Sequence, residues 1–109
     1  MDLPKKDKKI ARQIIETGYQ RELEKGLSGF DTILTDWKEK KKGNNESYRL
    51  LYKKLTVFDK HIGRRYNNIT GSRYYPTIAS QLYDGIITQE DIKELSEEIV
   101  QKLNFRNSM

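Results

Sequence analysis

The sequence predicts an all-α protein, a small antiparallel helical bundle of four to five helices with two long ones. Three observations favour this fold class. Apolar residues recur at steps of three or four along two long stretches, a short glycine-containing turn separates these stretches, and a capping pattern opens the last segment. Steps of three or four place side chains on one face of an α-helix, whereas a half-buried strand alternates at every second residue.

The clearest stretch runs from Tyr48 to Tyr75 and contains five of the seven tyrosines and the only histidine. Asn44 or Asn45 is a suitable N-cap for its helix, and Glu46 would lie in the first turn, near the positive end of the helix dipole. The residues between the apolar positions are mostly Lys, Arg, Asp and Asn. We expect the helix to bury one stripe against other helices: Tyr48, Leu51, Leu55, Phe58, Ile62, Tyr66 and Ile69.

An earlier helical pattern follows Pro4, a residue that suits the first turn of a helix. The pattern allows one helix from about residue 5 to 41, and a kink or break near Gly18 is the alternative, because glycine weakens a helix interior. Gly43 would end this helix. Since the connection over 43–45 is short, the two long helices should be antiparallel neighbours.

Within the first helix, apolar residues alternate at steps of four and three, a heptad-like seam typical of antiparallel helix packing. Gly26 and Gly29 would allow another helix to approach closely. We interpret the seam as bundle core, with an oligomer interface as the alternative. Its members are Leu23, Leu27, Phe30, Leu34 and Trp37.

The C-terminal third predicts two more helices. One should begin at Pro76, because the residue before a proline avoids helical angles, and should end at Gly85. Thr88 would cap the last helix, with Asp91 three residues on completing an approximate capping box. The buried stripe of this last helix would be Ile92, Leu95, Ile99 and Leu103.

Length and composition indicate one domain over residues 1–109, with 1–4 and 105–109 frayed. Although 34% of residues are charged, the apolar residues are in helical register, which favours order over disorder. The absence of cysteine excludes disulfides and thiolate metal sites. No apolar run approaches the roughly 18 residues that a membrane span needs, and no signal-peptide core follows the N-terminus, so we expect no membrane association and a cytoplasmic location.

Charge is unevenly distributed along the chain. Residues 45–75 carry seven basic and two acidic side chains, whereas residues 76–109 carry three and six. One interpretation is internal neutralisation, with the acidic last helix packed beside the basic centre. The other is a basic face left open to an anionic partner.

Candidate catalytic and metal-binding groups give little support for an enzyme. His61 is the only imidazole, and Asp59 points elsewhere on a helix, so neither a histidine metal site nor an oriented general base is indicated. The segment from Asp84 to Asp91 imitates half a calcium loop, but Ser80 and Leu82 stand where further ligands are needed. We expect a non-enzymatic protein with no cofactor and no metal.

A basic, tyrosine-rich corner at residues 64–75 is the candidate anion or nucleic-acid contact. Guanidinium groups bind phosphates and tyrosines can stack on unpaired bases, but the same residues can also pack a helix corner. The expected function is therefore a small interaction or regulatory module that binds a protein or self-associates, with weak, salt-dependent nucleic-acid binding as the alternative. The corner consists of Arg64, Arg65, Tyr66, Arg73, Tyr74 and Tyr75.

Overall fold

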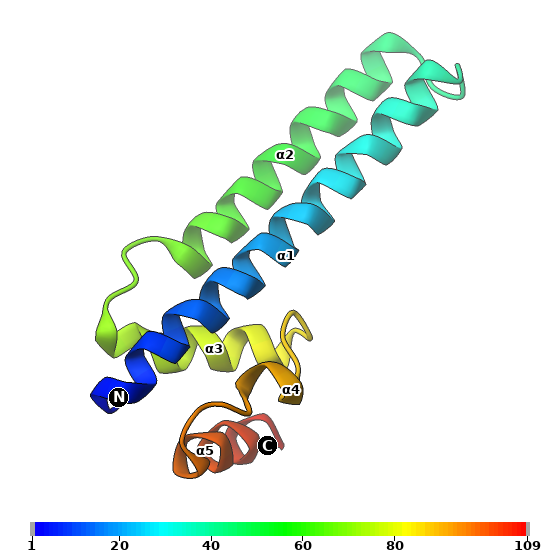
Figure 1. The fold of residues 1–109 in the computed structure, drawn as a ribbon. Coiled ribbons are helices and arrows are strands. Elements are labelled where there is room, and N and C mark those ends of the chain that lie inside the picture. Colours follow the sequence, from blue (N-terminus) through cyan, green and yellow to red (C-terminus); the bar gives the residue numbers. More distant parts are fainter. Residues whose placement is uncertain (1, 109) are drawn as a thin grey trace. The chain divides into compact units, whose positions relative to one another are not determined.

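The computed structural model describes residues 2–108, and the side chains of residues 2–105. All regular secondary structure in these residues is helical, which confirms the all-α prediction (Figure 1). Two helices are long, α1 (Lys5–Lys38) and α2 (Asn44–Tyr66). They are followed by the 3₁₀ turn η1 (Gly71–Arg73), α3 (Tyr74–Tyr83), α4 (Gln89–Ile92) and α5 (Glu97–Ser108).

The chain divides into two compact units, and each is described by itself. Unit 1 comprises Met1–Arg21 and Asn68–Met109, and unit 2 comprises Glu22–Asn67. Helix α1 is unbroken through Gly18, so the continuous helix is the correct alternative. The expectation of one domain with frayed ends stays a prediction; Leu3 is buried, α5 reaches Ser108, and Met1 and Met109 lie outside the described residues.

The hydrophobic core lies in unit 1, where α3 packs against α5 and the first half of α1 covers them. Gln81 is fully buried, and its Nε2 donates to the carbonyl oxygen of Ile15 at 3.1 Å, beside Gly18. Of the apolar residues of α3, Ile78 and Ala79 are buried and Leu82 is half-buried, and the predicted burial of the last stripe is confirmed. The core consists of Leu3, Ala11, Ile14, Ile15, Tyr74, Ile78, Ala79, Ile87, Ile92, Leu95, Ile99 and Leu103.

The start of α3 was predicted two residues too late. The helix begins at Tyr74, and Pro76 occupies its third position. A proline there loses no hydrogen bond, because the first N–H groups of a helix have no intrahelical acceptor. The predicted end is confirmed: Gly85 has a φ of +74°, a left-handed conformation that glycine adopts without steric cost.

The prediction of a single last helix after Thr88 was wrong, because this segment forms two helices. The capping interactions at its start are as predicted, since Asp91 Oδ2 accepts the backbone N–H of Thr88 at 2.7 Å. The first helix, α4, ends after one turn at Ile92. Ser96 then precedes α5, and its N–H and hydroxyl both bind the buried carboxylate of Asp7. The apolar stripe stays buried across this break because the same core covers both helices.

Unit 2 is a helical hairpin, called the hairpin below. The second half of α1 and the whole of α2 run antiparallel and side by side, as predicted (Figure 1). The predicted end of α1 and the predicted N-cap of α2 were wrong. Lys40, with a φ of +61°, ends α1 in a left-handed conformation, and Gly43 is the N-cap of α2. Asn44 is the first residue of α2, and its Oδ1 accepts a hydrogen bond from Trp37 Nε1 instead of capping the helix.

Candidate interaction surface on the helical hairpin

The two helices of the hairpin meet through small residues and one aromatic pair. The ring of Phe58 fills the space beside Gly26, where a Cβ atom would lie 2.4 Å from the ring. Phe30 meets Phe58 edge to face, with ring centroids 5.7 Å apart. At Gly29 the neighbour is the flexible end of Lys54. The prediction that these two glycines allow a close approach is confirmed.

The predicted burial of both apolar stripes of the hairpin is wrong in part. In the heptad seam of α1, Leu27, Leu34 and Trp37 are exposed, and in the stripe of α2, Tyr48 and Leu55 are exposed. The physical reason is that two helices can bury only the sides that face each other, whereas the apolar stripes here are wider than that contact. Gly26, Phe30 and Phe58 occupy the contact between the two helices, and the exposed apolar side chains lie beside that contact.

Five of the exposed apolar side chains lie on one side of the hairpin. An α-helix turns by about 100° per residue, so Leu27 and Leu34 lie about 80–100° from Gly26, in the direction of increasing residue number. Tyr48, Tyr52 and Leu55 lie about 60–120° from Phe58 in the same sense. In two antiparallel helices, equal rotation from the contact line leads to the same side of the pair. Val57, rotated the other way, lies on the opposite side.

We call this surface the apolar face. Its five side chains are each between 38% and 71% exposed. Because an aromatic side chain can bury about 150–250 Å², the face exposes on the order of 500 Å² of side-chain surface. Contiguous apolar patches beyond a few hundred Å² usually mark a site of interaction. The members are Leu27, Leu34, Tyr48, Tyr52 and Leu55.

A buried charge cluster holds the open end of the hairpin together. Glu22 of α1 is 4% exposed and receives hydrogen bonds from Arg65 Nη1 at 2.7 Å and from the Tyr66 hydroxyl at 2.5 Å, both in α2. His61 Nε2 lies 2.6 Å from the other carboxylate oxygen. Burial raises the pKa of Glu22, but the hydrogen bonds from Tyr66, Arg65 and His61 outweigh it, so that the pKa lies below its ordinary value. The sequence did not predict this contact, because Glu22 lies about 40 positions from its partners.

His61 therefore has a carboxylate within reach. The hollow beside Trp37 and the hollow beside Ile14 do not include His61 in their linings. The arrangement is that of a structural ion-pair cluster, in which Glu22 is an acceptor shared by three donors. The prediction that the protein is not an enzyme remains open.

The structure places the predicted basic corner on both units. Arg64, Arg65 and Tyr66 belong to the hairpin, whereas Arg73, Tyr74 and Tyr75 belong to unit 1. Within their own units, Arg65 and Tyr66 bind Glu22, and the hydroxyl of the buried Tyr74 accepts a hydrogen bond from Arg12 Nε at 2.8 Å. Arg64 and Arg73 are exposed and Tyr75 is half-buried. Nucleic-acid binding by this corner stays a prediction.

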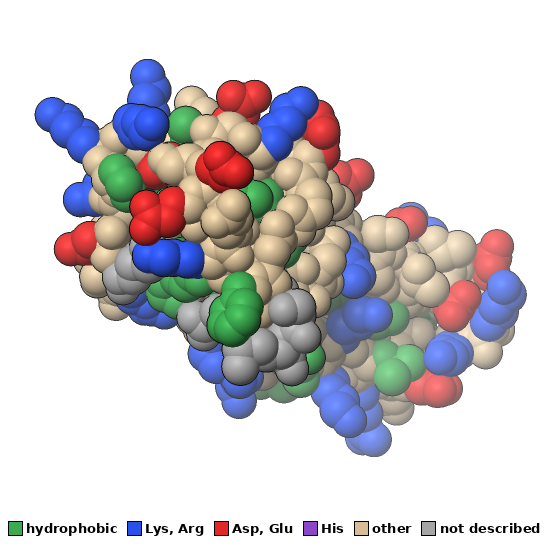
Figure 2. Space-filling view, turned by 90° about the horizontal axis from the view of Figure 1, so that it is seen from below, with side chains coloured by type: hydrophobic (Ala, Val, Ile, Leu, Met, Phe, Trp, Pro, Cys, Tyr) green, Lys and Arg blue, Asp and Glu red, His purple; other side chains and the backbone are tan. Residues whose placement is uncertain are grey.

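The charge of the protein is concentrated on the hairpin. Residues 22–67 carry eleven basic and seven acidic side chains, a charge of +4 out of the total of +5. Unit 1 is nearly balanced, and Figure 2 shows acidic and basic side chains interspersed over it. An anionic partner would therefore be attracted mainly to the hairpin.

Comparisons with other proteins and with general site types give no further assignment. No protein-family model, curated protein or solved structure matches this chain. Across the described residues, no helix has the length and hydrophobicity needed to cross a membrane, and no group of three potential metal ligands occurs.

Proposed function

We propose that this is a non-enzymatic interaction module whose apolar face binds an amphipathic helix of a partner protein, with acidic residues flanking the apolar stripe of that helix. A cytoplasmic location is part of the proposal, because a chain without cysteine gains nothing from an oxidising compartment. The observation that carries the proposal is the apolar face, which the hairpin exposes on one side only.

A helix is the partner element that best fits this surface. The apolar face comes from two neighbouring antiparallel helices, so a third helix lying between them would bury both stripes at once. Docking of an amphipathic helix into such a groove is a common mode of recognition, with anchors at steps of three and four residues. Two exposed tyrosines favour the same interpretation, since aromatic side chains are enriched at binding surfaces.

The charge of the hairpin favours an acidic partner over a second copy of this chain. Two hairpins facing each other would bring +4 against +4, and like charges across an interface oppose binding. Acidic residues beside the apolar stripe of a partner helix would instead face basic side chains of the hairpin such as Arg49 and Lys60. The partner is therefore expected to associate faster at low salt.

The test uses a synthetic helix as the probe. We would measure binding of a fluorescently labelled peptide with leucines at heptad spacing and glutamates on both flanks, and of the same peptide with lysines on the flanks. The glutamate peptide should bind, and the lysine peptide should bind at least tenfold more weakly. Tyr52→Glu should weaken binding of the glutamate peptide at least tenfold, because it places a charge in the centre of the face.

Val57→Glu is the matched control. Val57 lies in the same helix and is 60% exposed, compared with 64% for Tyr52, but it lies on the other side of the hairpin. The proposal fails if both substitutions weaken binding equally or if neither peptide binds. It also fails if sedimentation equilibrium shows a dimer that Tyr52→Glu dissociates, since the face would then bind a second copy.

A further inference from the structure

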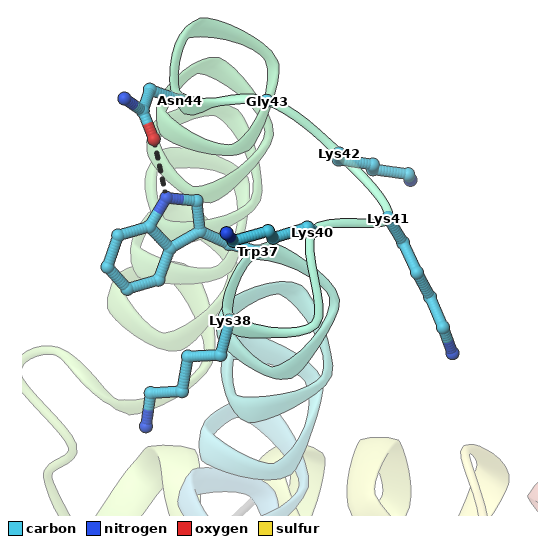
Figure 3. A pocket seen from close by; sticks show the side chains of 7 residues that line it. All are labelled: Trp37, Lys38, Lys40, Lys41, Lys42, Gly43 and Asn44. Carbon is cyan, nitrogen blue, oxygen red and sulfur yellow. Dashed lines mark hydrogen bonds between the residues drawn. The ribbon is translucent and has the colours of Figure 1, made fainter.

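The loop that joins the two helices of the hairpin forms a second distinctive surface, called the lysine tip below. Four lysines and one tryptophan surround a hollow of about 640 Å³ there (Figure 3). Trp37 is the only tryptophan in the chain, and no residue of the tip belongs to the apolar face. The tip consists of Trp37, Lys38, Lys40, Lys41, Lys42 and Asn44.

The indole of Trp37 is held in place but remains accessible. Its Nε1 donates a hydrogen bond to Asn44 Oδ1 at 2.7 Å, which fixes the ring against the start of α2. The residue is nevertheless 42% exposed. A planar ring with a fixed orientation and an open face can stack on another planar group, with little conformational entropy left to lose.

Most of the positive charge at the tip is not neutralised. Lys41 makes an exposed ion pair with Glu39 at 3.1 Å, which is the kind of pair that contributes little. In the part of the chain that the structure describes, no acidic side chain pairs with Lys38, Lys40 or Lys42. Three unpaired ammonium groups within five residues, on the same loop as an exposed indole, form a site for an anion that also carries aromatic rings.

We propose that the lysine tip binds single-stranded nucleic acid, with one base stacked on Trp37 and successive phosphates bound by Lys38, Lys40 and Lys42. Single-strand binding sites generally combine a basic path for the backbone with aromatic side chains on which bases stack. Such a site reads little sequence, because every base has a face that can stack. This property is independent of protein binding at the apolar face.

The arrangement of the lysines favours a strand over a free nucleotide. In Figure 3, Lys38 and Lys40 lie on the side of the loop where Trp37 lies, whereas Lys41 and Lys42 point away on the other side. Ammonium groups that bind one polyphosphate would converge on a single point. The lysines of the tip instead follow one another along the loop and point in different directions. A bilayer surface is a poorer fit, since Trp37 is the only apolar side chain that lines the hollow.

The experiment measures binding of a labelled 12-nucleotide oligouridylate by fluorescence anisotropy, together with the emission of Trp37. The oligonucleotide should quench Trp37, because the base stacks on the indole. With three phosphate contacts, and a salt exponent of about −0.7 for each on a single strand, affinity should fall roughly 20-fold between 50 and 200 mM salt. Trp37→Leu should weaken binding at least fivefold, and Trp37→Phe should restore part of the loss.

The lysines are tested with a charge-matched pair of triple variants. Exchanging Lys38, Lys40 and Lys42 for glutamine should lower affinity at least tenfold and flatten its salt dependence. Exchanging Lys5, Lys6 and Lys9, which are exposed in unit 1, removes the same charge and should change affinity less than threefold.

Several results would overturn the proposal. Equal losses from the two triple variants would mean that only the net charge matters. Absence of Trp37 quenching would exclude stacking at the tip. Adenosine triphosphate that binds as tightly as the oligonucleotide would indicate a free-nucleotide site, and binding to phosphatidylserine vesicles without binding to the oligonucleotide would indicate a membrane surface.

Discussion

The carboxylate of Asp7 accepts hydrogen bonds from both the backbone N–H of Ser96, at 2.9 Å, and its hydroxyl, at 2.5 Å. The two residues are 89 positions apart, and Asp7 is fully buried. In a capping box, an acidic side chain in the third helical position accepts the N–H of the N-cap residue. Asp7 accepts the N–H of Ser96 at the start of α5 in the same way, but it belongs to another helix, α1. This contact joins the first and last helices of unit 1.

Asp7→Ala should destabilise unit 1. The substitution leaves the N–H and the hydroxyl of Ser96 without their acceptor, which should lower the free energy of unfolding by about 1–3 kcal/mol. Urea unfolding followed by circular dichroism would measure the change. Asp2→Ala, at an exposed position nearby, is the control and should leave the midpoint almost unchanged; an equal shift from both would contradict a capping role for Asp7.

Glu22→Gln should weaken the hairpin. Arg65 is only 8% exposed in its side chain, so loss of the Glu22 charge leaves a nearly buried guanidinium unpaired and should cost about 2–3 kcal/mol at pH 7. Because the pKa of Glu22 is lowered in the folded state, the stabilisation is present above the ordinary carboxyl pKa and is lost as pH falls through the lowered value. The variant and the natural protein should therefore converge in acid. Glu24→Gln, at an exposed neighbour, should show no such pH dependence.

Asp91 should titrate unusually low. Arg21 holds its carboxylate with two hydrogen bonds, of 2.8 and 3.0 Å, and this interaction lowers the pKa of Asp91 to about 2 despite some opposing burial. The stability that this pair contributes is present above pH 4 and is lost as pH falls through about 2. Carboxyl NMR titration of Arg21→Gln should find the pKa of Asp91 moved upward. The same titration of Arg12→Gln should find it unchanged.

Gly26 and Gly29 should respond differently to alanine. At Gly26 a Cβ atom would lie 2.4 Å from the stiff ring of Phe58, so Gly26→Ala should destabilise the hairpin by about 1–3 kcal/mol. At Gly29 the neighbour is the end of Lys54, which can move, so Gly29→Ala should be neutral or stabilising by up to about 1 kcal/mol. Thermal unfolding of both variants would decide, and equal midpoints would contradict the close packing at Gly26.

Lys40→Gly should stabilise the hairpin. The turn after α1 has the hydrogen bonds of the turn after α3: the N–H of Lys40 binds the carbonyl of Trp37, as that of Gly85 binds Leu82. Gly85 takes the left-handed position in one turn, but Lys40 takes it in the other, at a steric cost of about 1 kcal/mol. Part of that cost is recovered by glycine, so thermal unfolding should show a gain of about 0.5–1 kcal/mol. Lys41→Gly, one position later, should give no gain.

The sequence by itself determined the elements whose signals are local. Helical periodicity predicted the helices, the spacing of Thr88 and Asp91 predicted a cap, and Gly85 predicted the end of α3. Each of these depends on interactions within about four residues, although the local signals at Gly43 and Asn44 did not place the ends of the long helices. The antiparallel hairpin also followed from the sequence, because a short turn leaves no other arrangement.

Tertiary structure alone decided which side of each helix is covered. Periodicity shows that an apolar stripe exists, but it does not show whether a neighbour is wide enough to bury it. In the hairpin, Gly26 and Phe58 take the contact and leave Leu27 and Tyr52 outside, which creates the apolar face. The sequence did not predict the break at Ser96 or the cluster around Glu22, for a related reason. Both depend on partners tens of residues away, which only the packed chain brings within hydrogen-bond distance.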